Sequence, residues 1–471
     1  MDITKSIIED KKSGLSDKEI GDKYGVNLKF IEKIVTKDIG INISKLSINN
    51  KFIKKFYPKD FEIEKKSVWS FKSRGDWATH NGNYRGNWSP YIPRNIILRY
   101  SKEEELVLDY FCGAGTTAIE CKLLNRNFIG TDINPYAIDL AKSNLDFGES
   151  YSNLFKPEIE LVIGDARELN FIENHSIDLI CAHPPYSDII NYTSNNPNDL
   201  SNFNPQNFLI EMEKVAMESK RVLKDNKYCA ILIGDMRKNK RVIPLGFWTI
   251  ERFLNTGFKL NELIIKRQHN CKTTGFWYTN SIKYNFLLLA HEYLAVFKKV
   301  NDLDSKFDCD LKVSEVRPLL EYDTVTLNRD MQLESTTVWI FNYKDWYDKT
   351  ISNLIKRYST NNFLLIEGQK KLPDKKFGLI ITFPQKEFSN EIDFAINKLE
   401  QDGILAIVCQ DFRMKNNLIF SQPLEIEKKL RERSELKIKE IVVISIENGI
   451  TIAEVKNLEI SHKYILIYQK T

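Results

Sequence analysis

Along residues 104–300 of this 471-residue chain, short apolar runs alternate with longer segments whose apolar positions have helical spacing. Short continuous apolar runs are typical of buried strands, and amphipathic segments of helical length follow them. This alternation predicts an α/β fold with a doubly wound parallel sheet covered by helices on both faces. The predicted strands are ELVLDYF, NFIGTDI, IELVIGD, IDLICAH and YCAILIGD, and the predicted helices are GTTAIECKLLNR, PYAIDLAKSNL, LIEMEKVAMESKRVL and LGFWTIERFLNTG.

Polar residues stand at the ends of five of these predicted strands. They are Asp109, Asp132, Asp165, His183 and Asp235. Ligands of open α/β sheets bind beyond the carboxyl ends of the strands. We therefore expect these side chains to surround one ligand site.

The N-terminal segment, residues 1–55, has a different pattern. It is lysine-rich, and GLSDKEIGDKYGVNLKFIEKIV places apolar residues at helical spacing around a break at Gly25. This pattern predicts a helix-turn-helix-like segment in which Lys29 and Lys33 contact DNA phosphates. A small helical appendage with a purely structural role fits the same pattern.

The second half of the chain repeats the order of the first. From Trp69 to His183 is 114 positions, whereas from Trp339 to Phe383 is 44, so the copy is shorter by 114 − 44 = 70 residues. The missing stretch is where the glycine-rich turn lies in the first half. We therefore predict a catalytic domain over 56–300 and a degenerate copy over 301–471. The matching stretches are VWSFKSRGDW and VWIFNYKDW, IDLICAHPP and FGLIITFPQ, AILIGDMR and AIVCQDFR, and HEYLAVFKK and HKYILIYQK.

Composition limits the class of protein more than it defines it. A net charge of +4 neither requires nor excludes nucleic acid, so any basic footprint has to be local. No stretch has the length of a membrane span and the N-terminus has no signal-peptide core, so a cytoplasmic protein without membrane association is expected. The seven cysteines include no C-x-x-C pair. They predict reduced, buried thiols and no metal site.

The stretch VLDYFCGAGTTAIE combines a strand, a glycine-bearing turn and a helix start. Gly113 and Gly115 allow a ligand to approach the backbone, but the third glycine of a dinucleotide site and the Lys-Ser/Thr of a phosphate loop are absent. The turn therefore predicts a nucleoside ligand without a bound pyrophosphate. Asp132 suits the two ribose hydroxyls, and Asp165 suits an adenine amine.

FCGAGTT, DINP, GDA and HPPY follow one another in this order, and YRGNWSPYIPRNIILRYS precedes them. Over residues 66–300 these motifs resemble the amino-group DNA methyltransferases, which modify adenine N6 or cytosine N4. The resemblance implies a Rossmann-like methyltransferase sheet, S-adenosylmethionine as cofactor and S-adenosylhomocysteine as product. It also implies that the cofactor lies against Pro90, Asp109, Phe111, Gly113, Gly115, Thr116, Asp132 and Asp165.

HPPY, residues 183–186, is the candidate catalytic corner. The lone pair of an exocyclic amine is delocalised into the base. Acceptors at a His183 ring nitrogen and the Pro184 carbonyl would turn that lone pair toward the methyl group. Pro184 and Pro185 stiffen the corner, and Tyr186 would stack on a base flipped out of the duplex. The family usually has Asp, Asn or Ser where this chain has His183, which leaves the choice between adenine and cytosine open.

Contacts to nucleic acid are expected from two segments with interleaved basic and aromatic residues, 71–88 and 264–284. Ordinary surface loops with aromatic anchors have the same composition. The asparagine-rich stretch after Tyr186 either closes over the flipped base or only connects two elements. The candidate nucleic-acid-binding residues are Lys29, Lys33, Arg85, Lys266, Arg267, Gln268 and Lys272.

Together these features predict a site-specific DNA methyltransferase acting on double-stranded DNA. The resemblance alone implies a restriction-modification or defence setting with a cognate restriction endonuclease. The degenerate half, where TFPQ replaces AHPPY, is expected to serve target recognition or dimerisation, and a homodimer is left open. Two other functions fit the sequence: an RNA base methyltransferase, and a catalytically inactive DNA-binding regulator on a methyltransferase fold.

Overall fold

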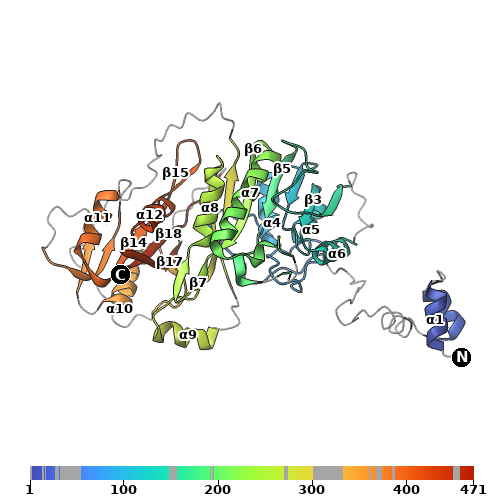
Figure 1. Ribbon diagram of the computed structural model, residues 1–471, viewed down its shortest axis with the longest axis horizontal. Coiled ribbons are helices and arrows are strands. Elements are labelled where there is room, and N and C mark those ends of the chain that lie inside the picture. Colours follow the sequence, from blue (N-terminus) through green and yellow to red (C-terminus); the bar gives the residue numbers. More distant parts are fainter. Residues whose placement is uncertain are drawn as a thin grey trace. The chain divides into compact units, whose positions relative to one another are not determined.

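A computed structural model describes residues 3–12, 15, 17–26, 31, 53, 55–147, 156–190, 192–193, 196–269, 274–300, 333–359, 362–366, 374–384, 388–448 and 457–471. The chain divides into two compact units, Met1–Lys54 and Lys55–Thr471. Figure 1 shows the two sheets of the larger unit.

The smaller unit contains two short helices, α1 (Ile3–Lys12) and α2 (Asp17–Tyr24). Ile7, Ile20 and Ile31 are buried together in one small hydrophobic cluster. The Tyr24 hydroxyl donates to Asp10 at 2.6 Å, which ties α2 to α1. Lys29 and Lys33 lie outside the described residues, so the helix-turn-helix stays a prediction.

The first sheet of the larger unit has eight strands in the order β1-β9-β10-β6-β5-β2-β3-β4. β10 runs antiparallel to both of its neighbours, and the other neighbouring strands are parallel. This confirms the predicted α/β class, with one reversed strand that the sequence pattern did not reveal. The strands are β1 (Val68–Ser70), β2 (Leu106–Asp109), β3 (Asn127–Asp132), β4 (Ile159–Ile163), β5 (Ile177–Ala182), β6 (Leu223–Gly234), β9 (Lys259–Arg267) and β10 (His291–Lys298).

Helices cover both faces of this sheet because the strands are apolar on both sides. In β5, Leu179 and Cys181 pack into one hydrophobic cluster with α4 (Tyr91–Tyr100), α5 (Thr116–Leu123) and α6 (Pro135–Asn144). The alternate residues Ile180 and Ala182 pack into the other cluster, with α7 (Pro205–Val222) and α8 (Leu245–Asn255). This alternation is the two-residue period of a strand buried on both faces. The remaining elements of this half are η2 (Ser187–Ile189), η3 (Leu200–Asn202), β7 (Met236–Lys238), β8 (Arg241–Ile243) and α9 (Thr274–Lys283).

The second sheet repeats the arrangement of the first with six strands, in the order β11-β17-β18-β14-β13-β12. Here β18 is the reversed strand, as β10 is in the first sheet. Among the described residues, this half has no counterpart of α5, β3, α6 and β4. The predicted degenerate repeat is confirmed, and the shortening falls where the sequence placed it. The elements are β11 (Val338–Asn342), α10 (Trp346–Tyr358), β12 (Phe363–Ile366), β13 (Phe377–Thr382), α11 (Ser389–Lys398), β14 (Leu399–Cys409), β15 (Asp411–Arg413), β16 (Ile419–Ser421), α12 (Gln422–Arg431), β17 (Leu436–Glu447) and β18 (His462–Lys470).

The two halves share one hydrophobic core. Its cluster of buried residues runs from Phe247 and Tyr293 in the first half to Tyr464 and Leu466 in the second. The rings of Phe247 and Tyr464 lie with centroids 6.0 Å apart. Burial across this boundary therefore stabilises both halves together.

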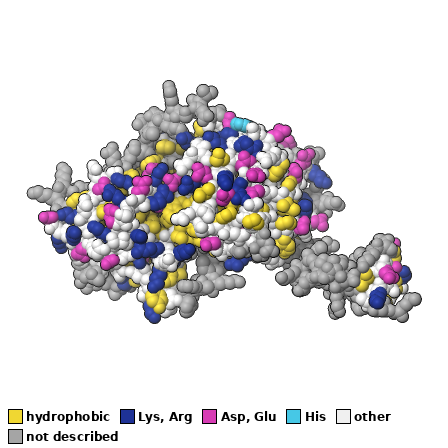
Figure 2. Space-filling view, in the orientation of Figure 1, with side chains coloured by type: hydrophobic (Ala, Val, Ile, Leu, Met, Phe, Trp, Pro, Cys, Tyr) yellow, Lys and Arg dark blue, Asp and Glu magenta, His cyan; other side chains and the backbone are white. Residues whose placement is uncertain are grey.

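Charges are mixed over the face that carries α7 and α8. Figure 2 shows Lys and Arg side chains interspersed there with Asp and Glu, with no single basic stripe. Within the described part of the chain, every helix is too short or too polar to cross a membrane.

Candidate active site

The glycine turn joins β2 to α5 in a conformation that excludes larger residues. Gly113 has φ +49° and Gly115 has φ +82°, both in the left-handed region. A Cβ on Gly115 would lie 3.0 Å from the Cβ of Ala141 in α6, and one on Gly113 would lie 3.2 Å from the Tyr84 ring. Gly113 therefore leaves a backbone cradle open beside Tyr84, and Gly115 lets α6 pack closely against the turn.

Asp109, at the end of β2, holds this turn from below. Its carboxylate accepts from the Thr117 hydroxyl at 2.5 Å and from the Phe111 backbone N–H at 3.0 Å. Burial raises its pKa to about 7. Both carboxylate oxygens are engaged within the turn, and Asp109 is absent from the residues that line the adjoining cleft.

Asp132, at the end of β3, faces that cleft. Its carboxylate accepts from the backbone N–H of Gly113 at 3.0 Å and of Asn134 at 2.9 Å, which fixes its orientation. Burial raises its pKa to about 6, despite these two hydrogen bonds. At neutral pH Asp132 is an oriented, ionised acceptor for hydroxyl groups.

The cleft lies beyond the carboxyl ends of β2, β3, β4 and β5, where ligands of open α/β sheets bind. Tyr84 and Tyr192 both line it, with stacked rings 6.1 Å apart. Arg74 holds the segment that carries Tyr84 by donating to the backbone oxygens of Asn87 and Trp88 at 2.7 and 2.8 Å. The position of the cleft and its paired rings suit a nucleoside.

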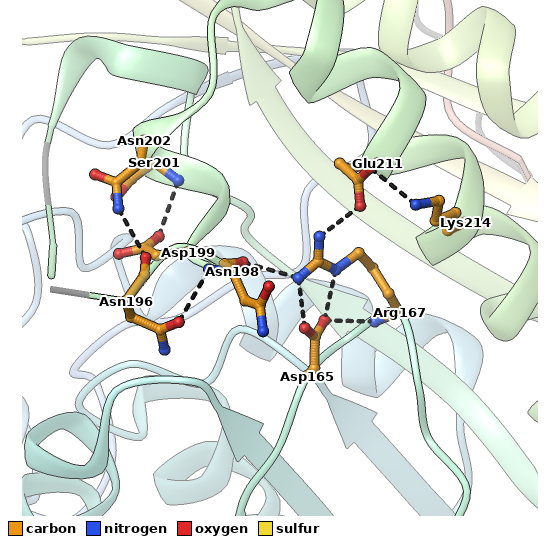
Figure 3. A network of polar contacts seen from close by, with 9 residues as sticks. All are labelled: Asp165, Arg167, Asn196, Asn198, Asp199, Ser201, Asn202, Glu211 and Lys214. Carbon is orange, nitrogen blue, oxygen red and sulfur yellow. Dashed lines mark hydrogen bonds and ion pairs between the residues drawn. The ribbon is translucent and has the colours of Figure 1, made fainter.

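Asp165 lines the same cleft, but Arg167 already binds its carboxylate. Figure 3 shows the guanidinium facing Asp165, with contacts of 2.9 and 2.6 Å. The same guanidinium pairs with Glu211 in α7 and donates to the Asn198 backbone oxygen at 2.9 Å. Arg167 thus fixes the orientation of Asp165 and ties the asparagine-rich segment to the rim of the cleft. A carboxylate has lone pairs beyond those that Arg167 uses, so the adenine-amine role stays a prediction.

The HPPY corner comes directly after β5. The His183 ring stacks on Trp88 with centroids 5.5 Å apart, and its Nε2 lies 2.8 Å from the Tyr186 hydroxyl. Tyr186 donates to Glu292 at 2.8 Å, and Lys266 donates to the other oxygen of Glu292 at 2.8 Å. A continuous chain of hydrogen bonds therefore connects His183 to β9 and β10.

The surroundings of His183 keep its ring neutral. Burial lowers its pKa to about 4, so the imidazole is neutral at physiological pH. Burial raises the pKa of Glu292, but nearby charges, that of Lys266 first, and the hydrogen bonds from Lys266 and Tyr186 together lower it more, so the carboxyl pKa lies below its usual value. Tyr186 gives its single proton to Glu292, so its oxygen can accept from Nε2 of His183, and the imidazole ring also has a hydrogen bond with the Gly86 backbone.

A second cavity, of about 470 Å³, adjoins the cleft at this corner. His183, Trp88 and Pro185 line both cavities. A group in the first cavity and a group in the second can therefore meet beside His183. The second cavity is also lined by Pro184, Tyr186, Lys266, Arg267, Gln268 and Glu292.

The predicted residues fall into three groups in the structure. Phe111, Gly113, Asp132, Asp165 and His183 line the cleft. The second cavity brings the other residues of the corner together with three of the predicted nucleic-acid contacts, Lys266, Arg267 and Gln268. Five predicted residues line neither cavity: Pro90, Asp109, Gly115, Thr116 and the exposed Arg85. Lys272 lies outside the described residues.

Sequence reasoning missed four side chains of this site: Tyr84, Trp88, Tyr192 and Glu292. Tyr84 and Trp88 stand in YRGNWSP, whose family likeness assigns no role to its aromatic residues. Glu292 had a signal of its own, because the repeat places Lys463 at the matching position. A residue that differs between an intact copy and a degenerate one is a candidate for function.

Comparisons with known proteins agree with this geometry. Residues 8–143 match the family model described as DNA methylase, and residues 101–273 match one described as a methyltransferase domain. The type II methyltransferase M2.LlaDCHI of Lactococcus lactis subsp. cremoris is 36% identical over 91 residues, 19% of this chain and 33% of the relative. M.HpaI of Haemophilus parainfluenzae is 51% identical over 81 residues, 17% of this chain and 26% of the relative. The chain thus spans a third or less of the length of these curated relatives.

A solved structure of a SAM-dependent methyltransferase from Methanosarcina mazei aligns with 44% of this chain and 98% of its own. Its TM-score is 0.31 at 16% identity, which adds nothing to the strand order already described.

The strand order, with its one reversed strand and its glycine turn after β2, defines a Rossmann-like methyltransferase. Over residues 8–143 the chain is similar to the amino-group DNA methylases, and the type II relatives share that likeness. S-adenosylmethionine is the cofactor that this likeness implies. The glycine cradle that a Cβ would fill and the oriented carboxylate of Asp132 both fit that cofactor.

Proposed function

We propose that this chain is a site-specific DNA methyltransferase that transfers a methyl group from S-adenosylmethionine to adenine N6 or cytosine N4. The observation that carries this proposal is the position of the HPPY corner at the junction of two cavities. The cleft beside Asp132 suits a nucleoside cofactor. The adjoining cavity is large enough for a flipped base.

Three residues of the chain would hold the cofactor in the cleft. Asp132 accepts from the two ribose hydroxyls, and Asp165, oriented by Arg167, accepts from the adenine amine. The Gly113 backbone lets the ligand approach the end of β2 closely. When bound, the cofactor supplies an electrophilic methyl group on a sulfonium.

The corner would act on the amine of the base. A ring nitrogen of His183 and the Pro184 carbonyl would accept from its N–H groups, so that the nitrogen lone pair points into the cleft. His183 and Pro184 would thereby aim the lone pair at the methyl group that the cofactor supplies, so that the new N–C bond would form while the electrons of the C–S bond stay on sulfur. The nitrogen then loses one proton to solvent. Tyr186 and Glu292 hold the His183 ring in place throughout this step.

Lys266, Arg267 and Gln268 line the mouth of the second cavity and would contact the phosphates and base edges of double-stranded DNA. The type II relatives favour a restriction-modification setting with a cognate endonuclease. An RNA substrate is the second candidate. A tRNA (guanine(10)-N2)-dimethyltransferase of Methanothermobacter thermautotrophicus is 31% identical over 105 residues, 22% of this chain and 29% of that relative.

The test is transfer of labelled methyl groups from S-adenosylmethionine to mixed genomic DNA, with mass spectrometry of the product nucleosides. We expect N6-methyladenine or N4-methylcytosine. His183→Ala should lower kcat by about 10² to 10⁴, as is typical when a group that aids proton handling is lost. His183→Asn should keep much of the activity, because an amide oxygen restores the acceptor.

Cofactor binding without transfer to DNA would overturn the proposal, and transfer to tRNA in the same assay would establish the second candidate. If His183→Ala and His183→Asn lower kcat equally, His183 does not act as a hydrogen-bond acceptor in the reaction. The exposed His175 supplies a control, since His175→Asn should leave kcat unchanged.

A further inference from the structure

The two halves of the chain meet through contacts that recur with the halves exchanged. Arg237, on β7 of the first half, pairs at 2.5 Å with Glu440 on β17 of the second. Arg413, on the matching β15 of the second half, pairs at 2.5 Å with Glu262 on the matching β9 of the first. Two backbone contacts also recur with the halves exchanged. Lys66, ahead of β1, bridges Glu459, ahead of β18, and Thr336, ahead of β11, bridges Leu288, ahead of β10.

A second matched set links the reversed strands. In each half, an aspartate that follows the central strand accepts a hydrogen bond from a tyrosine hydroxyl. That hydroxyl also contacts a histidine ring. The other nitrogen of the histidine contacts a serine or threonine hydroxyl of the other half. The first set is Asp235, Tyr293, His291 and Thr337, with distances of 3.0, 2.9 and 2.9 Å. The second is Asp411, Tyr464, His462 and Ser67, with distances of 3.1, 2.9 and 2.7 Å.

Reciprocal contacts of this kind define an isologous interface, in which one surface patch meets its own copy. The chain therefore contains a two-fold pair of methyltransferase-like halves joined in one polypeptide. Within the described residues, only the first half retains α5, β3, α6 and β4, which carry the cofactor cleft. The second half occupies the place that a second subunit would take.

The matched set of the first half leads directly to the candidate active site. Thr337 Oγ1 is bonded to His291 Nδ1 at 2.9 Å and accepts from the Ala290 backbone N–H at 3.0 Å. Glu292, which follows His291 in β10, accepts from Tyr186 and Lys266. His291 and Glu292 both line the second cavity. In the second half the residue after His462 is Lys463, so the same hydroxyl contact there supports no such carboxylate.

We propose that the second half works as a built-in second subunit whose Thr337 is a positioning residue for methyl transfer, an inference that rests on the proposed function. Thr337 fixes the start of β10, β10 places Glu292, and Glu292 holds Tyr186 and through it His183. Thr337, His291 and Glu292 are all buried, so water does not replace a lost contact without displacement of the strand. A displacement of about 1 Å at a reacting group can cost about 10²-fold in rate.

The symmetry of the interface provides a matched control. Thr337→Val and Ser67→Ala each remove one hydroxyl from equivalent sites and break equivalent contacts to His291 or His462. Both should lower the melting temperature by similar amounts. Thr337→Val alone should lower kcat, by roughly 10- to 100-fold, with KM for S-adenosylmethionine unchanged because the cleft does not include β10. Thr337→Ser should restore kcat.

A second readout does not depend on turnover. In protein with labelled histidines, the imidazole signals of His183, assigned with His183→Asn, should shift in Thr337→Val and stay in place in Ser67→Ala. Equal kcat in the two variants, or unshifted His183 signals in Thr337→Val, would overturn the positioning role. If wild-type protein transfers no methyl group, the proposed function fails, and the His183 signals still decide whether Thr337 positions that ring.

Discussion

At the scale of single residues, the two halves differ in a few side chains that decide where chemistry is supported. Glu292 of the first half accepts from Tyr186 and Lys266, whereas the matching Lys463 of the second half has the opposite charge. His183 is likewise replaced by Phe383, which has no hydrogen-bonding ring nitrogen. The second half therefore lacks these hydrogen-bond acceptors, although it keeps the strands that carry them in the first half.

The pH dependence of the reaction should separate Asp132 from His183. Asp132 has a pKa of about 6, so it loses its charge as pH falls through 6, and KM for S-adenosylmethionine should then rise. The His183 ring faces Glu292, Lys266, Arg74 and Tyr186 and has a pKa of about 4. It stays neutral, so kcat should be constant from pH 8 down to roughly 5. Steady-state kinetics over this range test both statements.

Asp132→Asn provides the control, since it should abolish the pH step in KM and leave KM high throughout. A fall in kcat centred near the ordinary pKa of histidine, about 6.5, would contradict the neutral state of His183.

At the scale of elements, the cofactor cleft depends on one block, α5-β3-α6-β4, inserted between β2 and β5. Its first turn is possible only with glycine, because Gly115 combines a left-handed φ with close contact to α6. The second half joins β12 to β13 without this block and still forms a sheet of the same order. The block therefore adds a ligand site to a scaffold that is stable without it.

Gly115→Ala should lower the free energy of unfolding by about 2 kcal/mol, because a Cβ is disfavoured at positive φ and meets Ala141 at 3.0 Å. Denaturant titration measures the loss. Gly378→Ala is the matched control. Its new Cβ would have only ordinary contacts, at 3.4 Å or more, so stability should hardly change. Equal effects of the two changes would show that the turn tolerates a side chain.

At the scale of the whole molecule, the interface between the halves determines how the larger unit holds together. Glu440 and Glu262 are buried, and each is neutralised by an arginine from the other half. Neither half buries this surface by itself, so we expect both to unfold together.

Arg237→Ala and Arg413→Ala should each lower the free energy of unfolding by about 3–5 kcal/mol, since each leaves a buried carboxylate unpaired. Their losses should agree within about 1 kcal/mol, because the two sites are equivalent. Arg433→Ala, which removes an arginine from a more exposed pair with Asp393, should cost only about 0–1 kcal/mol. Clearly unequal losses at Arg237 and Arg413, measured by denaturant titration, would contradict the two-fold equivalence.

The sequence by itself determined the α/β class, the glycine turn, the strand-end acids, the HPPY corner and the place of the deletion in the second half. These features are local, since each depends on spacing along a strand, a turn or a helix. The family likeness rests on the same local motifs.

Only the tertiary structure decided which partners these residues have. It placed Arg167 on Asp165, Glu292 behind Tyr186 and Thr337 behind His291. It also showed that Asp109 supports the glycine turn instead of facing the cleft. Such contacts join positions up to hundreds of residues apart in the sequence. The spacing of side chains along one strand does not indicate which distant residues will pack against that strand. The two-fold interface has the same cause, because its reciprocity is visible only when both halves are folded against each other.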